Sequence, residues 1–120
     1  MAKKILIIED DHTVLGMLKS AFEKQGYKVI PAKDGEGGLK EMEDKGPDLV
    51  VVDTLLPGID GFEVCRRIKE DNSAAAPKVI MITGSADAVD AVKARKMGAD
   101  DYCAKTSDFS PLLKAVKKLI

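Results

Sequence analysis

Short apolar segments alternate with helical patterns five times along the chain, and this alternation restricts the possible folds more than any other feature. Apolar residues recur three and four positions apart within the helical segments, as one buried helix face requires. Repeated βα units imply right-handed crossovers and a parallel sheet with helices on both faces, so the sequence predicts a doubly wound α/β fold. The expected strands cover residues 5–8, 28–31, 49–53, 79–82 and 102–104, and the expected helices cover 14–22, 36–45, 62–68, 88–97 and 112–119. In the fourth helix, Ala88 and Val92, with Val89, are expected to carry the buried face. Asp108 can cap the last helix, and Pro111 falls within its first turn.

The size and charge of the chain fit one small domain. It has 120 residues, 45% of them hydrophobic, and no linker-like stretch, so it can bury a single sizeable core. We therefore expect one domain over residues 1–120. The 19 basic and 20 acidic residues leave no basic footprint, which argues against direct binding to nucleic acid.

No segment has the composition of an export signal or a membrane anchor. The N-terminal lysines precede only a short apolar run, and no stretch reaches 18 apolar residues. Cys65 and Cys103 lie far apart and outside any CxxC pattern. We expect a cytoplasmic protein without membrane association, in which both cysteines are reduced and serve in packing.

Two of the apolar runs end directly in carboxylates. The first leads into Glu9, Asp10 and Asp11, and the third leads into Asp53. Neighbouring parallel strands end at the same edge of a sheet, so these acids should lie close together. Two carboxylates about 6 Å apart repel by roughly 3 kcal/mol at a partly screened site, and a cation or a proton must relieve this repulsion. The pattern predicts a hard-metal site around one special aspartate.

Other polar residues follow the remaining strands. Thr83 and Lys105 come after the fourth and fifth expected strands and add a hydroxyl and an ammonium to the same edge. Simpler roles compete with a shared site. Asp10 and Asp11 could do no more than cap the following helix, and the threonine and lysine could be ordinary strand-end residues. The joint placement favours a site, with Asp11 as a helix cap and His12 as a solvated surface residue.

Four sequence motifs together resemble the receiver domains of two-component response regulators, the CheY-like family. The motifs occur in the family's order over essentially the whole chain, and their joint spacing is far more specific than any one of them. The resemblance implies a flavodoxin-like fold, with five strands in the order 2-1-3-4-5, and a phosphorylation-activated signalling switch. The motifs are Ile-Ile-Glu9-Asp10-Asp11, Asp53-Thr-Leu-Leu-Pro57-Gly-Ile-Asp-Gly61, Thr83-Gly-Ser, and Gly98-Ala-Asp-Asp-Tyr102-Cys-Ala-Lys105.

The resemblance implies that Asp53 is the phosphoacceptor. The phosphoryl group would come from a histidine kinase, a phosphotransfer protein or a small acyl phosphate. A carboxylate that attacks an anionic phosphoryl group needs a divalent cation to offset the repulsion. Asp10 and Asp53 would bind this cation directly, Glu9 through water, and Leu55 through its backbone carbonyl. An oxygen site that keeps some waters suits Mg²⁺, with Mn²⁺ as a substitute.

The resemblance also assigns roles around the acceptor. Lys105 would neutralise the phosphoryl oxygens and Thr83 would hydrogen-bond one of them. Tyr102 is either a packing aromatic or a switch that moves inward with the threonine, and we favour the switch. Such a protein is not an enzyme in the usual sense, because it catalyses only its own phosphorylation and dephosphorylation.

The sequence departs from the family pattern at three places. Receivers usually have Lys-Pro-Phe where this chain has Lys105-Thr106-Ser107. A cis bond to threonine costs about 3 kcal/mol, so we expect a trans or strained bond and a looser loop. Gly84 replaces a common alanine and leaves the approach to the phosphate open. Leu55 and Ser85 flank the path of an attacking water, and the apolar leucine cannot orient that water, which predicts slow self-dephosphorylation.

The output of the switch is the least defined part. The sequence ends after the last expected helix, so we expect either a stand-alone receiver or one excised from a longer regulator or kinase. Output would pass to a protein partner through the surface around the fourth helix, fifth strand and fifth helix. This surface is either a cationic docking face or an ordinary solvated one. Its basic residues are Lys93, Arg95, Lys96, Lys114, Lys117 and Lys118.

Two other classes of protein remain as alternatives. A phosphohydrolase with an aspartyl nucleophile, as in the haloacid dehalogenase family, needs a second acid two residues after the nucleophile, and Leu55 occupies that position. A receiver-like interaction module that is never phosphorylated is slightly favoured by the Lys-Thr-Ser departure.

Overall fold

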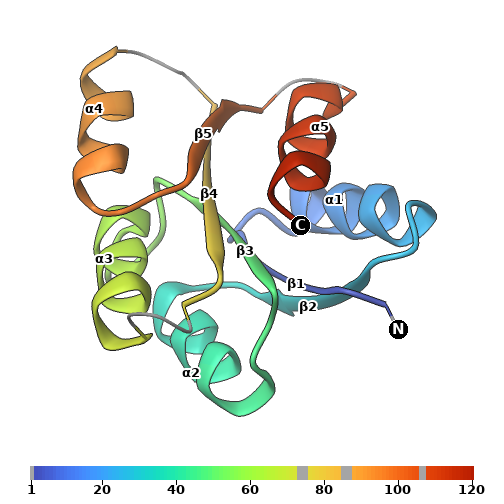
Figure 1. Cartoon of the computed structure of the whole chain (residues 1–120), viewed down its shortest axis with the longest axis horizontal. Helices are drawn as coiled ribbons and strands as arrows, with labels where there is room; N and C mark the ends of the chain where they lie inside the picture. The colour runs from blue at the N-terminus through green and yellow to red at the C-terminus, as the bar shows by residue number, and fades with distance from the viewer. Residues whose placement is uncertain (1, 73–75, 85–87, 106–107) are drawn as a thin grey trace.

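The computed structural model describes residues 2–72, 76–84, 88–105 and 108–120. Five strands and five helices alternate strictly along the chain (Figure 1). The strands are β1 (Lys4–Ile8), β2 (Lys28–Ala32), β3 (Leu49–Asp53), β4 (Lys78–Thr83) and β5 (Asp101–Ala104). The helices are α1 (His12–Lys24), α2 (Gly35–Lys45), α3 (Gly61–Asn72), α4 (Ala88–Lys96) and α5 (Ser110–Leu119).

All five strands form one parallel sheet in the order β2-β1-β3-β4-β5. Helices α1 and α5 lie on one side of the sheet, and α2, α3 and α4 lie on the other (Figure 1). The predicted doubly wound fold and its strand order are therefore confirmed. Every crossover returns the chain to the same end of the sheet, so the carboxyl ends of β1, β3, β4 and β5 share one edge.

The central strands are apolar on both faces because helices cover both. Ile5 and Ile7 of β1 belong to the core beneath α1 and α5, whereas Leu6 and Ile8 belong to the core on the opposite face. All four side chains are fully buried. Such continuous apolar runs are typical of strands covered on both faces.

The two cysteines are free and buried, and they lie in different cores. Cys65, on α3, packs in the core between the sheet and the layer of α2, α3 and α4, whereas Cys103, on β5, packs in the core on the α1 and α5 side. The sheet separates them, and burial raises the pKa of each thiol to about 11. They serve in packing, as the sequence predicts.

Close packing of α2 against β1 explains why Gly38 is present, although glycine lowers the helix propensity of this segment. A Cβ atom at Gly38 would lie 2.3 Å from Cδ1 of Ile8, so only glycine lets the helix approach β1 this closely. The carboxylate of Asp34 accepts a hydrogen bond from the Gly37 amide at 2.7 Å and stabilises the start of the helix.

The expected buried face of α4 is wrong at Val92, the one of its three residues whose side chain the structure describes. Val92 was expected to carry the packing with Ala88 and Val89, but its side chain is 53% exposed. Ala94 is fully buried instead. A small side chain lets the helix lie close to β5, and this tertiary contact outweighs the greater hydrophobicity of valine. The side chains at positions 88 and 89 lie outside the described residues.

The start of α5 also differs from the expectation. Phe109, not Asp108, occupies the N-cap position, and no side chain caps the helix there. The Asp108 carboxylate accepts a hydrogen bond from the amide of Ser110, the first helical residue, at 3.1 Å. Pro111 lies within the first turn, as predicted.

None of the helices among the described residues is long and apolar enough to cross a bilayer.

Candidate functional site

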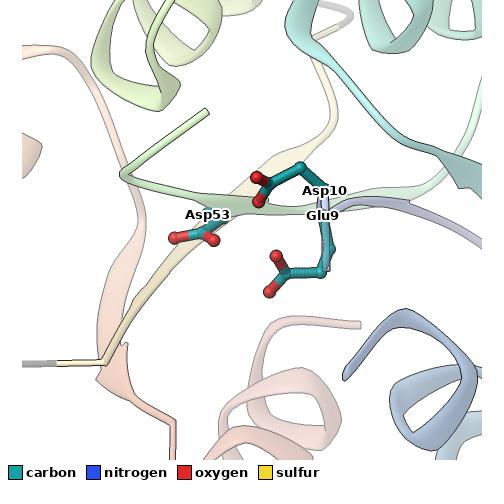
Figure 2. A group of neighbouring side chains, drawn as sticks. All are labelled: Glu9, Asp10 and Asp53. Atoms are coloured by element: carbon teal, nitrogen blue, oxygen red, sulfur yellow. The ribbon is translucent and has the colours of Figure 1, made fainter. Parts of the chain in front are cut away.

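Three carboxylates gather at the carboxyl edge of the sheet (Figure 2). Glu9 and Asp10 directly follow β1, and Asp53 is the last residue of β3. One oxygen from each lies within 4.8 Å of the others. Glu9 is fully buried and Asp53 is 5% exposed, whereas Asp10 is exposed to solvent. The strand-end rule therefore places these three acids together, as predicted from the sequence.

One ammonium group faces this cluster. The Nζ atom of Lys105 lies 2.9 Å from Asp53 Oδ2 and 2.6 Å from Glu9 Oε1. The lysine backbone is held by a 2.7 Å hydrogen bond from its amide to the carbonyl of Thr83. Three carboxylates against one ammonium leave a local excess of two negative charges, which a single divalent cation would balance.

The electrostatics of Glu9 reflect its burial. Its Oε2 accepts a hydrogen bond from the Asp11 amide at 3.1 Å, whereas the buried Oε1 accepts no well-directed hydrogen bond and has only the ion pair with Lys105. Burial raises the pKa of Glu9 to about 7, although Lys105 and the Asp11 amide both lower it. Burial also opposes the charged form of Lys105, but its interactions with the Glu9 and Asp53 carboxylates outweigh this effect and raise its pKa.

The donor set fits a hard divalent cation. All three side chains offer carboxylate oxygens, the ligands that Mg²⁺ and Mn²⁺ prefer, and Oε1 of Glu9 lacks a hydrogen-bond donor. The exposed Asp10 leaves room for water on the outer side. Asp11 is separate from this set, because its Oδ1 accepts hydrogen bonds from the amides of Thr13 and Val14 and caps α1, as predicted.

The backbone around Asp53 is closely packed. Asp53 Oδ1 accepts a hydrogen bond from the Leu55 amide at 3.2 Å. A Cβ atom at Gly61 would lie 2.0 Å from the carbonyl oxygen of Asp53, so any larger residue would displace the end of β3. Our sequence analysis assigned no role to Gly61. Its position at the first residue of α3 was the available signal, but the close approach depends on tertiary packing.

Two buried threonines lie at the same edge of the sheet as the acids, one at the end of β4 and one directly after Asp53. Thr83 ends β4 and is 3% exposed. Thr54 is equally buried, and our sequence analysis overlooked it. The hydroxyl oxygen of Tyr102 is buried, and no hydrogen-bond partner for it lies among the described residues. Positions Ser85, Thr106 and Ser107, on which sequence expectations were placed, lie outside the described residues.

A cleft opens next to the site between the β3–α3 loop and α4. It has a volume of about 450 Å³ and includes Leu55, whose side chain is 78% exposed, and Gly84. Lys93 closes one side, with its Nζ 4.4 Å from the ring centroid of Phe62. Lys93 therefore contributes less to a free cationic face than its sequence position suggests.

Comparison with known proteins identifies the class. The family model described as response regulator receiver domain matches residues 5–117. The transcriptional regulatory protein AfsQ1 of Streptomyces coelicolor is 44% identical over 101 residues, covering 84% of this chain and 44% of that protein. The alkaline phosphatase synthesis transcriptional regulatory protein PhoP of Bacillus subtilis is 40% identical over 111 residues, covering 92% and 45%. The chain thus spans about half the length of these curated relatives.

A solved structure agrees with this assignment. Response regulator protein TrrA of Thermotoga maritima, in complex with Mg²⁺-BeF, has a TM-score of 0.89 at 31% identity, covering 98% of this chain and 99% of that chain. The chain belongs to the response regulator receiver domain family, whose members are phosphorylation-activated signalling switches of two-component systems. Members of this family bind Mg²⁺ at an acidic pocket and interact with histidine kinases.

Proposed function

We propose that Asp53 is the phosphoacceptor of a Mg²⁺-dependent signalling switch. The observation that carries this proposal is the bridge from Lys105 to both Asp53 and Glu9 at the edge of three clustered carboxylates. The donor would be a histidine kinase, a phosphotransfer protein or a small acyl phosphate. A structural ion pair would need one carboxylate, whereas this cluster holds two more negative charges than its lysine can balance.

The transfer would proceed by direct displacement at phosphorus. One Asp53 oxygen forms the new bond to phosphorus, and the bond from phosphorus to the donor's imidazole nitrogen or acyl oxygen breaks. Lys105 then pairs with a phosphoryl oxygen in place of the carboxylate, and the Thr83 hydroxyl donates a hydrogen bond to another. These groups lie at strand ends and are already positioned, so little reorganisation is required.

The metal ligands would be Glu9, Asp10 and Asp53 together with the backbone carbonyl of Leu55. When bound, Mg²⁺ or Mn²⁺ supplies the positive charge that lets a carboxylate approach an anionic phosphoryl group. Glu9 must be ionised to serve, so its raised pKa couples metal binding to release of a proton near neutral pH.

The switch would run through Thr83 and Tyr102 to the surface of α4, β5 and α5. The hydroxyl of Tyr102 is buried and has no hydrogen-bond partner among the described residues, which supports a side chain with more than one packing arrangement. We expect a protein partner at this surface and no direct contact with nucleic acid. The exposed Leu55 supports slow self-dephosphorylation, because its side chain cannot orient an attacking water. This self-directed chemistry is the only catalysis we expect of the chain, which we treat as one cytoplasmic unit over residues 1–120.

Intact mass spectrometry after incubation with acetyl phosphate and Mg²⁺ tests the proposal. The wild-type chain should gain one phosphoryl group, and Asp53→Asn should gain none. Asp101→Asn, a change at an exposed acid outside the cluster, is the matched control and should behave as wild type. Absence of any mass gain with acetyl phosphate and with a histidine kinase would instead favour a silent interaction module. A phosphorylated half-life of seconds would contradict the role given to Leu55.

A further inference from the structure

We propose that Thr54 is a positioning residue for Thr83, and that its hydroxyl holds the Thr83 hydroxyl toward the phosphoryl group on Asp53. The two threonines are buried at the ends of adjacent strands. Thr54 directly follows Asp53 and is 2% exposed, and Thr83 ends β4 and is 3% exposed. A buried hydroxyl is costly unless it forms a hydrogen bond, so two of them side by side indicate a shared role. The inference rests on the proposed function, because it assigns Thr83 to the phosphoryl group.

The register of the sheet makes these two residues neighbours. Asp53 pairs with Ile82 across the parallel strands β3 and β4. The Thr54 amide donates a 3.0 Å hydrogen bond to the Ile82 carbonyl, so the ladder continues one residue beyond this pair. Thr54 therefore lies opposite Thr83, on strands that are about 4.8 Å apart.

Both side chains point to the same face of the sheet. Side chains alternate along a strand, and Val52 and Met81, one residue before the Asp53–Ile82 pair on each strand, belong to the core on the α2, α3 and α4 side. Both threonines also line the cleft of about 450 Å³ beside α4. Cross-strand threonine pairs on one face are close enough to form hydrogen bonds.

The backbone around the two hydroxyls is held in place. The Thr54 amide bonds to Ile82, and the Thr54 carbonyl accepts the Gly61 amide at 3.2 Å. The Thr83 carbonyl accepts the Lys105 amide at 2.7 Å. The hydroxyls thus project from fixed strand ends, and rotation about χ1 is the main freedom that remains to each.

A hydroxyl has one proton and two lone pairs, and this inventory gives Thr54 its role. When Thr83 donates its proton to a phosphoryl oxygen, its own oxygen can only accept. The Thr54 hydroxyl is the cross-strand donor, which completes a chain from Thr54 through Thr83 to the phosphoryl group. Each bond in such a chain polarises the next, and the first bond favours the Thr83 rotamer that faces β3. Valine would fill the same space at a lower cost of burial, but it has no proton to donate.

Substitutions of similar shape separate the Thr54 hydroxyl from the packing of its side chain. Thr54→Val removes the donor and keeps the shape, so affinity for fluoroberyllate, a phosphoryl mimic, should fall about fivefold in Mg²⁺. Thr54→Ser keeps the hydroxyl and loses a methyl group, so it should bind within about twofold of wild type. Mg²⁺ affinity should stay unchanged in both variants, because Thr54 points to the opposite face of β3 from the Asp53 carboxylate.

NMR titration measures both affinities, and the three-bond couplings of the Thr83 methyl group report its rotamer. With fluoroberyllate bound, wild type and Thr54→Ser should show one Thr83 rotamer, whereas Thr54→Val should show an average of several. Thr83→Ala should lose about tenfold in affinity, and in that background Thr54→Val should cost less than about twofold. Val50→Ala, which removes a fully buried side chain from the same face of β3, is the control for lost packing. It should lower stability and leave the affinity and the rotamer unchanged.

Three results would overturn the inference. One is a wild-type affinity and rotamer for Thr54→Val while Thr83→Ala binds weakly, which would leave the proposed function intact. Another is an equal loss for Thr54→Ser and Thr54→Val, which would assign the effect to packing. The third is an undiminished Thr54→Val effect in the Thr83→Ala background. If wild type itself does not bind fluoroberyllate in Mg²⁺, the proposed function fails and the positioning role fails with it.

Discussion

Two lysine and carboxylate clusters lie at opposite ends of the sheet, and they differ in charge balance. At the amino end of β4 and β5, Lys69 Nζ lies 2.7 Å from Asp100 Oδ2 and donates a 2.9 Å hydrogen bond to the carbonyl of Pro77. Asp100 Oδ2 also accepts the Val79 amide at 2.8 Å. At the carboxyl end, Lys105 faces Glu9 and Asp53, with Asp10 next to them.

The difference separates a structural cluster from a functional one. One cation and one anion satisfy each other at the amino end, and the carboxylate also serves a backbone amide, so removal of either partner leaves a polar group without its bond. At the carboxyl end, excess negative charge is retained and is relieved only by a cation or a proton. The amino-end cluster should therefore contribute to stability. The carboxyl-end cluster lowers stability in the absence of a bound cation, and its excess negative charge allows it to bind a cation.

Asp100→Ala should give the largest loss of stability. It leaves Lys69 without its carboxylate and the Val79 amide without its acceptor, at two partly buried positions. We expect a loss of about 3 kcal/mol in the free energy of unfolding, measured by urea denaturation. Glu70→Ala, at an exposed position on α3 next to Lys69, should cause no measurable change. A loss for Asp100→Ala no larger than for Glu70→Ala would remove the contrast between the two ends.

Mg²⁺ should stabilise the protein through the carboxyl-end cluster alone. At a free concentration of about 100 times the dissociation constant, the gain in unfolding free energy is about 2.7 kcal/mol. Asp10→Asn, at the exposed acid, should abolish this gain without disturbing the core. Asp100→Ala should retain it in full. Equal stabilisation by KCl at matched ionic strength would point to screening and not to a bound metal.

Without metal, Glu9 should make stability fall as pH rises. Its pKa is raised from the unfolded value of 4.5 to about 7, so the folded state binds more protons between these pH values. The stabilising contribution is complete below pH 4.5 and is lost as pH rises through 7. Relative to Glu9→Gln, wild type should lose about 2 kcal/mol between pH 5 and pH 8. Denaturation curves of both proteins in EDTA measure this difference, and parallel pH profiles would show that Glu9 titrates normally.

Much of the fold follows from local sequence rules, because each rule has one outcome in a parallel sheet. Continuous apolar runs such as residues 49–52, short and rich in β-branched residues, indicate strands covered on both faces. The strand-end rule then brings Glu9, Asp10, Asp53 and Lys105 together. The sequence alone therefore identifies the four charged groups of the candidate site.

What the sequence could not reveal depends on contacts between elements. Val92 is more hydrophobic than Ala94, yet the alanine is buried because helix α4 lies close to its neighbours. Gly61 matters because another backbone approaches it, and Phe109 takes the N-cap position of α5 because its ring fits the core. Neither approach distance nor ring packing has a signal in hydrophobic periodicity.

Asp53→Asn should give the smallest change and the opposite sign to Asp100→Ala. The amide removes one of the clustered negative charges and can still accept the Leu55 amide, while Lys105 keeps its ion pair with Glu9. In EDTA at pH 8, we expect a gain of about 1 kcal/mol in unfolding free energy, measured by urea denaturation against wild type. Asp101→Asn, at an exposed acid outside both clusters, should leave stability unchanged. A clear loss of stability for Asp53→Asn would mean that the Asp53–Lys105 pair holds the fold as Asp100 and Lys69 do, because its attraction would then exceed the repulsion among the acids.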